Sequence, residues 1–204
     1  MKLNAKKSKV MPFNFSRKWD FVPNLEMGNE PLEVVFLTKL LGVIITSDCK
    51  FSENTKYLTK KGYNKLWFLR RLKNLGASQA TLINVYKLFV RQTLEFCAPL
   101  WSGAIKKSDR NALERVQRVA TLIIANDVTL SYTERLGQLM LDRLGPWRST
   151  LTKKCSIKMA ANLKHKYLLP KNKEGRPGTR NHTKYHTVRQ TGSNPVQFLN
   201  LLKF

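Results

Sequence analysis

Histidine and cysteine are the residue types that most often hold a transition metal, and the chain contains three of each. His182 and His186 are four residues apart and form the first candidate pair for a zinc ion. The cysteines at 49, 97 and 155 are widely spaced and never occur as Cys-x-x-Cys. Because no third and fourth ligand stands at a usual zinc spacing, the sequence predicts no metal site. The odd number of unpaired thiols suits a reducing compartment.

Constellations for catalysis are also missing from the sequence. It contains no P-loop and no Gly-x-Gly-x-x-Gly, and its histidines all lie in the C-terminal tail or its approach. The 13 acidic residues are scattered, with no obvious pair for acid–base work or for holding Mg²⁺. Taken on its residues alone, the chain is therefore interpreted as a binding module.

The charge balance points to an anionic partner. Lysine and arginine number 37 against 13 acidic residues, which gives a net charge of +24. Polyanions are the natural partners of such a chain, nucleic acid first and an acidic membrane surface second. No apolar run approaches the length of a membrane span, and the start is too polar for a secretory signal. We expect an intracellular protein, nuclear or cytoplasmic, with no membrane association.

The stretch 63–101 must position the central cations Arg70, Arg71 and Lys73, and its periodicity predicts two amphipathic helices. Gly76 is expected to end the first helix and Ser78 to cap the second. Leucines at 66, 69, 72 and 75 form the apolar face of the first helix. The second is expected to bury Leu82, Tyr86, Phe89 and Phe96 and to stop at Pro99.

Two short apolar runs precede these helices, at residues 32–37 and 40–45. Thr38 and Lys39 separate them, which predicts a hairpin or a bulged bend in a small sheet. Gly42 indicates a bulge or a close approach of another segment to the backbone.

Three further helices are predicted after residue 101. Ser108 or Asp109 should cap the first of them. Its expected apolar face is Leu113, Val116, Ala120 and Ile123, with Arg110, Glu114 and Arg118 as a solvated ladder of alternating charge. Ser131 and Glu134 predict a capping box for a shorter helix. Pro146 should lie in the first turn of the last helix, whose predicted buried face is Leu151, Cys155, Met159 and Leu163.

The predicted fold class is mainly α with a small β remnant, followed by a flexible tail. We expect short strands with a hairpin in residues 1–50, a helical bundle in 51–168 and a basic, largely disordered tail in 169–204.

Five segments of the chain resemble, in order, the C-terminal end of the polymerase of non-LTR (LINE-type, jockey-like) retrotransposon reverse transcriptases. They are LNAKKSKVM, KLLGVII, LWFLRRLKNLGAS, VYKLFVRQTLEFCAPLW and LERVQRVATLII. The resemblance covers residues 1 to about 165 and implies the last palm motifs, with palm-like strands, followed by a helical thumb. The parent family is an RNA-directed DNA polymerase whose partners are RNA and DNA as template–primer.

Individual residues acquire expected roles through this resemblance. Lys7 matches a lysine near the incoming triphosphate, with a possible auxiliary role in protonating pyrophosphate; alternatively it belongs to a solvated basic run. Leu41, Gly42 and Val43 match the hairpin of the primer grip. The thumb cations expected to contact nucleic-acid phosphates are Lys60, Lys61, Arg70, Arg71 and Lys73, with a merely solvated face as the alternative. Trp67 and Trp101 are expected either to stack on bases or to be buried between helices.

The sequence also departs from the family. The family's catalytic aspartates lie in motifs upstream of this sequence, and Met1 falls where the family's reading frame runs on. Phosphoryl transfer needs such carboxylates to hold Mg²⁺, so the metal is expected only for a full-length polymerase and this chain alone is expected to be inactive. The missing palm region is a further expected partner. Trp147 stands where the family tends to have one of a pair of arginines. This difference argues against a nucleic-acid contact by the neighbouring Arg148.

Three hypotheses follow. The chain is a truncated reverse transcriptase that binds template–primer through its thumb; or it is a basic helical interaction protein or a decayed relic without a polymerase role; or it still polymerises nucleotides.

Overall fold

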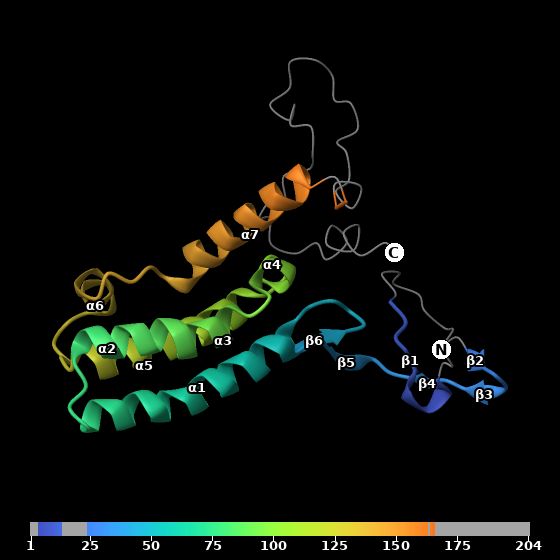
Figure 1. The fold of residues 1–204 in the computed structure, drawn as a ribbon, viewed down its shortest axis with the longest axis horizontal. Helices are drawn as coiled ribbons and strands as arrows, with labels where there is room; N and C mark the ends of the chain where they lie inside the picture. Colours follow the sequence, from blue (N-terminus) through green and yellow to red (C-terminus); the bar gives the residue numbers. More distant parts are fainter. Residues whose placement is uncertain (1–3, 14–23, 163, 166–204) are drawn as a thin grey trace, which may run out of the picture.

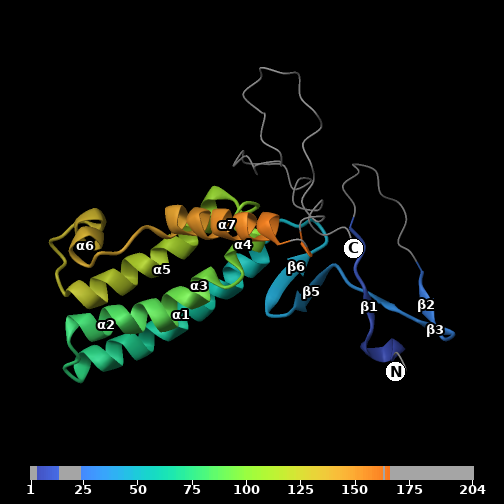
Figure 2. The ribbon, with the colours of Figure 1, turned by 45° about the horizontal axis from the view of Figure 1, so that its top comes forward.

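A computed structural model of the chain describes residues 4–13, 24–162 and 164–165. The described part is mainly helical with a few small strands, as the sequence predicts (Figure 1). The strands lie beyond one end of a helical bundle, and this arrangement is seen from two directions (Figures 1 and 2). The predicted tail 169–204 and the histidines at 182 and 186 lie outside the described residues.

Among the described residues, the N-terminal part contains one 3-10 turn and six short strands, which pair two by two. β1 and β4 are parallel, whereas β2–β3 and β5–β6 are antiparallel hairpins. The bounds are η1 Ala5–Lys7, β1 Lys9–Val10, β2 Glu26–Met27, β3 Glu30–Pro31, β4 Glu33–Val34, β5 Leu37–Leu40 and β6 Val43–Thr46.

The β5–β6 hairpin confirms the predicted hairpin but corrects its turn. Thr38 and Lys39 do not separate the strands but pair with Ile45 and Ile44 inside the ladder. The turn lies at Leu41 and Gly42, whose φ angles are 46° and 91°, because a two-residue hairpin turn needs left-handed backbone there. The close approach predicted at Gly42 is confirmed, since a Cβ atom on this residue would lie 3.0 Å from the Phe96 ring.

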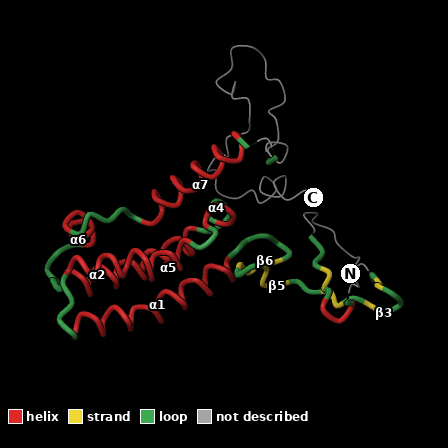
Figure 3. Tube along the Cα trace, viewed as in Figure 1, coloured by secondary structure: helices red, strands yellow, loops and turns green. Residues whose placement is uncertain are grey.

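Helices account for most of the rest of the described chain (Figure 3). Their bounds are α1 Ser52–Asn74, α2 Gln79–Val85, the π-helix η2 Tyr86–Arg91, α3 Gln92–Glu95, α4 Ala98–Trp101, α5 Lys107–Ala125, α6 Tyr132–Gln138 and α7 Leu144–Ala161. The α1 helix packs along α5 and along the α2–η2–α3 segment. The predicted turn between α1 and α2 is confirmed: Gly76 has a φ of 79°, and the Ser78 hydroxyl accepts the Thr81 amide at 3.2 Å.

The buried face of α1 agrees with the prediction except at its end. Leu66 and Leu69 are fully buried and Leu72 is partly buried. Leu75 was expected on this face but is 70% exposed, because α1 ends at Asn74 and the chain turns away at Gly76.

The π-helix η2 changes which residues of the second helix reach the core. Phe89 and Phe96 were expected to be buried, but Val90 and Leu94 are fully buried instead. The i→i+5 hydrogen bonding of a π-helix widens the turn. Val90, four residues after Tyr86, therefore faces the core, and Phe89 does not. The prediction that Pro99 ends this helix is also wrong. The chain leaves the helix at Phe96, whose ψ angle is 121°. Pro99 lies in the first turn of α4, where a backbone N–H would have no partner within the helix, so proline is tolerated there.

The ends of α5, α6 and α7 agree with most of the predictions. The predicted cap of α5 is wrong: the helix begins at Lys107, its N-cap is Lys106, and Ser108 and Asp109 lie in its first turn. The Asp109 carboxylate accepts the Lys106 amide at 3.4 Å and the Ser52 hydroxyl at 2.8 Å. The capping box of Ser131 and Glu134 is confirmed. Pro146 lies in the first turn of α7, also as predicted.

The buried faces of α5 and α7 differ in part from the predicted ones. In α5 the residues at 113, 116 and 120 are buried as expected, but Ile124 rather than Ile123 completes the face. In α7 the residues at 151, 155 and 159 are only partly buried, and residue 163 is not described. Leu144 and Arg148 are the buried residues of α7, which packs on α4 and α5.

Close packing at Gly62 gives a test of the bundle. A Cβ atom at Gly62 would lie 2.7 Å from the Leu94 side chain and 3.1 Å from that of Val116. We expect Gly62→Val to lower the free energy of unfolding by about 1–3 kcal/mol through overpacking. Gly137→Ala in α6 is the matched control: it meets no atom within 4 Å, so it should stabilise by about 0.5–1 kcal/mol. Urea unfolding measures both, and equal stabilities for the two variants would contradict the packing.

Candidate nucleic-acid interface

The predicted thumb cations do not all lie on one side of α1. Lys60, Lys61, Arg70 and Arg71 are exposed. At 100° per residue, Lys60 and Arg71 lie on the same side of the helix, while Lys61 and Arg70 lie on opposite flanks of it. The structure therefore divides these four cations over a broad surface of α1.

Lys73 is the exception among the five predicted cations. Its ammonium donates to the side-chain oxygen of Asn126, the left-handed residue that ends α5. Lys73 therefore ties the end of α1 to the end of α5, so its ammonium already has a partner within the fold.

A lysine from the hairpin joins Lys61 around one tyrosine. The Lys39 ammonium donates to the Tyr57 hydroxyl at 2.8 Å. The Lys61 ammonium lies 4.7 Å from the centre of the same ring. The hydrogen bond from Lys39 and the nearby Lys61 lower the pKa of Tyr57. Two ammonium groups thus meet at the junction of β5 and α1.

Lys65 continues this cluster one turn further along α1. Its ammonium donates to the Phe89 carbonyl oxygen at 3.0 Å and lies 4.0 Å from the centre of the Phe89 ring. Phe68 meets Phe89 edge-to-face, with 5.5 Å between ring centres. Burial and then the charge of Lys61 lower the pKa of Lys65. We call Lys39, Tyr57, Lys61, Lys65 and Phe89 the lysine–aromatic cluster.

Sequence reasoning identified only Lys61 of this cluster as a candidate site residue. Lys39 was expected to separate two strands and Phe89 to be buried, whereas Tyr57 and Lys65 were not singled out. The spacing of Tyr57, Lys61 and Lys65, at intervals of four residues on one helix, is a signal that could have identified the helical part of the cluster.

The residues matched to the primer grip lie at the tip of the β5–β6 hairpin. Leu41 is 89% exposed, Gly42 packs against Phe96, and Val43 is buried. The tip is therefore fixed to the helices by Gly42 and Val43, while Leu41 points to solvent. Lys39 lies in the same hairpin, which connects the tip to the lysine–aromatic cluster.

Lys7 does not join the α1 cations. It ends η1, is exposed, and lies with the N-terminal strands on the far side of the hairpin from α1 (Figure 1). Its neighbour Lys9 forms an ion pair with Glu33 at 2.8 Å across β1 and β4.

The two tryptophans singled out from the sequence have different environments. Trp101 is fully buried, and its indole N–H donates to the Phe96 carbonyl at 2.7 Å. Trp67 is 65% exposed. The expectation of burial between helices therefore holds for Trp101 only.

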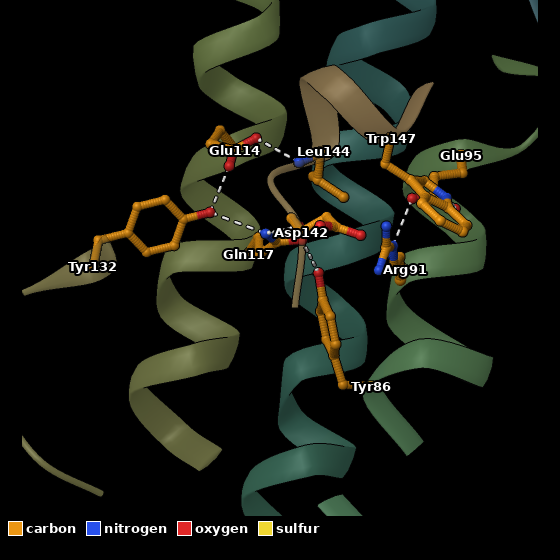
Figure 4. Close-up of polar contacts among 9 residues, drawn as sticks. All are labelled: Tyr86, Arg91, Glu95, Glu114, Gln117, Tyr132, Asp142, Leu144 and Trp147. Atoms are coloured by element: carbon orange, nitrogen blue, oxygen red, sulfur yellow. Dashed lines mark hydrogen bonds and ion pairs between the residues drawn. The ribbon is translucent and has the colours of Figure 1, made fainter. Parts of the chain in front are cut away.

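A second set of polar groups lies inside the bundle rather than on its surface (Figure 4). Gln117 accepts a hydrogen bond from the Tyr86 hydroxyl and donates to the Tyr132 hydroxyl and the Asp142 carbonyl, both at 3.0 Å. Tyr132 donates in turn to Glu114, whose other oxygen accepts the Leu144 amide at 3.2 Å. Glu114 was expected in a solvated ladder. Instead its carboxylate holds α6 and the start of α7, because both elements fold over this face of α5.

An ion pair next to this network connects α3 with α7. The carboxylate of Glu95 accepts from Arg91 at 2.7 Å and from the Trp147 indole at 3.0 Å, and the Arg91 guanidinium lies 4.5 Å from the centre of the Trp147 ring. Trp147 thus has its own structural role between α3 and α7. Arg148 is only 2% exposed, and burial lowers its pKa, so it cannot contact a partner on the surface.

This network has residue types that also occur in active sites, but its central members are buried. Tyr86 and Gln117 are fully buried, and burial raises the pKa of Tyr86. Burial and the hydrogen bond to Glu114 raise the pKa of Tyr132, so both phenols stay protonated. Because Tyr86 and Gln117 lie at its centre, the network holds the bundle together from inside.

The acidic residues do not form a site for Mg²⁺ in the described part of the chain. Asp48 pairs with Lys50, Glu53 with Lys56, and Glu95 with Arg91. No group of three or more acidic, histidine or cysteine side chains lies close enough to hold a metal within residues 4–13, 24–162 and 164–165. The residues that the structure describes do not fit the metal that the resemblance implies for a full-length polymerase.

The lysine–aromatic cluster predicts an early titration of Tyr57. A tyrosine whose pKa is lowered by folding stabilises the fold above its unfolded pKa, and this contribution is lost as the pH falls through the folded pKa. We expect Lys39→Met to raise the Tyr57 pKa toward its ordinary value, measured by tyrosinate absorbance against Tyr57→Phe. Lys56→Met is the matched control because Lys56 pairs with Glu53. An unchanged titration in Lys39→Met would refute the contact.

The buried network predicts a large cost for an apolar substitution. Gln117→Leu leaves the Tyr86 hydroxyl and the Asp142 carbonyl without their partner. We expect a loss of about 2–5 kcal/mol in the free energy of unfolding. Gln92→Leu, on the exposed side of α3, is the control and should change it by less than about 0.5 kcal/mol. Chemical denaturation measures both, and similar values would argue against the network.

Among the helices of the described residues, none has the length and apolar character needed to cross a membrane. Comparisons of the chain with protein-family models, curated proteins and solved structures found no match.

Proposed function

We propose that the chain is the end-of-palm and thumb part of a non-LTR retrotransposon reverse transcriptase and that it binds template–primer nucleic acid. One observation carries the proposal: exposed cations of α1 and a lysine of the β5–β6 hairpin meet beside aromatic rings, in a chain of net charge +24. Cations held on a helix and a hairpin, rather than on loops, suit the fixed spacing of a phosphate backbone. The ordered sequence resemblance supports the same assignment.

In this proposal the α1 cations contact phosphates without reading sequence. Lys60, Lys61, Arg70 and Arg71 bind the backbone, and Lys39 and Lys65 extend the surface toward the hairpin. Lys73 supports the helix pair through Asn126 and makes no such contact. The hairpin tip at Leu41 approaches the primer end.

Polymerisation is not assigned to the described residues. Asp48, Glu53 and Glu95 form ion pairs and Glu114 belongs to the buried network. The carboxylates for phosphoryl transfer would therefore come from a palm region. Such a palm region is the protein partner that the proposal implies, and RNA and DNA are the nucleic-acid partners.

A basic interaction protein is the second candidate. Apolar side chains of the hairpin strand β5 and of the residues beside it are exposed, which favours a protein partner at this strand. They are Phe36, Leu37, Leu40 and Leu41, with exposed fractions of 50% to 89%.

Charge reversal on α1 separates the two candidates. We expect Lys60→Glu/Lys61→Glu/Arg71→Glu to weaken binding to a template–primer duplex by at least about tenfold. It should also reduce the slope of log affinity against log salt by about 0.9 for each phosphate that the variant no longer neutralises. The matched control is Lys153→Glu/Lys154→Glu/Lys158→Glu on α7, where the same three charges are exposed.

Fluorescence anisotropy at several salt concentrations measures both variants. Equal losses of affinity in the two variants would mean that net charge alone is responsible and would contradict a binding surface on α1. An affinity of the unsubstituted chain that does not depend on salt would reject the proposed function and favour the interaction protein.

A further inference from the structure

Trp67 is a large apolar side chain that the fold leaves uncovered. It is 65% exposed in the middle of the longest helix. The other tryptophans in the described residues are engaged: Trp101 is fully buried, and the Trp147 indole donates to Glu95. Exposed tryptophan is uncommon on monomer surfaces and is frequent where a partner binds.

Cations flank this indole on its own side of α1. Lys60, Asn64, Trp67 and Arg71 follow one another at intervals of four, three and four residues, which places them in one row along the helix. All four are exposed. With a rise of 1.5 Å per residue, Arg71 lies about 6 Å beyond Trp67 and Lys60 about 10 Å before it. The row therefore presents a flat ring between two positive charges.

A groove runs beside the first half of this row. It has a volume of about 420 Å³ and lies between α1, which contributes Lys60, Tyr63 and Asn64, and Ala112 of α5. The Thr59 hydroxyl also lines the groove and has no hydrogen-bond partner among the described residues. The space is of the size that proteins use for small ligands, and its lining offers both polar and apolar contacts.

We propose that Trp67 stacks on an unpaired base of single-stranded nucleic acid, with Lys60 and Arg71 binding the flanking phosphates and the groove receiving a neighbouring nucleotide. The inference rests on the proposed function and specifies the form of nucleic acid that this row binds. A duplex covers the faces of its bases by stacking them on one another, so it offers phosphates but no face for Trp67. Only a single strand offers both an open base face for the Trp67 ring and phosphates for Lys60 and Arg71.

The test compares single-stranded and duplex DNA of the same length, about ten nucleotides, on the full chain. We expect Trp67→Ala to weaken single-strand binding about tenfold or more and to change duplex binding less than about twofold. Trp67→Phe keeps a ring and should recover most of the single-strand affinity. Ile157→Ala on α7 is the control, because Ile157 is 69% exposed and lies on another helix. Single-strand binding should also quench tryptophan emission, and Trp67→Phe should remove this quenching.

Four results would overturn the inference. Equal losses of affinity for the single strand and the duplex in Trp67→Ala would assign the indole to general binding. A loss of affinity in Trp67→Phe as large as in Trp67→Ala would exclude stacking. Unchanged single-strand binding in Trp67→Ala would reject stacking of a base on Trp67. If duplex binding still depended on salt, the proposed function would stand. Failure of the chain to bind either DNA at low salt would reject both proposals.

Discussion

The amide of Gln117, buried in the middle of α5, contacts three segments that are far apart in the sequence. It binds Tyr86 of η2, Tyr132 of α6 and the Asp142 carbonyl before α7. Buried polar groups are costly when unpaired and specific when paired, so these contacts fix how the surrounding helices sit on α5. Two further contacts hold the first turn of α7: Glu114 accepts the Leu144 amide, and Glu95, paired with Arg91, accepts the Trp147 indole.

The rigid bundle determines what α1 can present. Because α5 and the α2–η2–α3 segment cover one side of α1, its remaining cations have fixed positions. The π-helix contributes directly: Phe89 turns outward, and its ring and carbonyl then hold Lys65. The Phe96 ring, which packs against Gly42, supports the hairpin that supplies Lys39. The π-helix thus determines, through Phe89 and Phe96, where Lys65 and Lys39 lie on the surface.

The surface and the interior use the same residue types for different ends. Arg91 and Arg148 are buried beside tryptophan rings, where their charges are balanced by glutamates and serve packing. Lys60 and Arg71 flank a tryptophan on the outside, where their charges are available to a partner. Composition cannot separate these two uses, since burial alone decides whether an arginine beside a tryptophan stabilises a core or binds a ligand.

Local signals in the sequence determined much of the helical architecture. Gly76, Ser78, Ser131 with Glu134, and Pro146 mark helix ends through their own backbone and hydrogen-bonding preferences, and the structure places each where predicted. The spacing of the α1 leucines fixed its buried face up to Leu72. The ordered resemblance, and with it the proposed function, also came from the sequence alone.

Tertiary structure decided the rest, because those features depend on contacts between distant residues. Periodicity cannot anticipate a π-helix, so Phe89 and Phe96 were expected inside and Val90 and Leu94 were not. The sequence around Lys73 does not show that Asn126, some fifty residues later, accepts its hydrogen bond. The sequence around Glu114 likewise does not show that α6 and α7 pack over it. The meeting of Lys39 with Tyr57, and the difference between exposed Trp67 and buried Trp101, follow from packing between elements. Local propensity fixes where helices begin and end, whereas packing fixes which side chains remain for a partner.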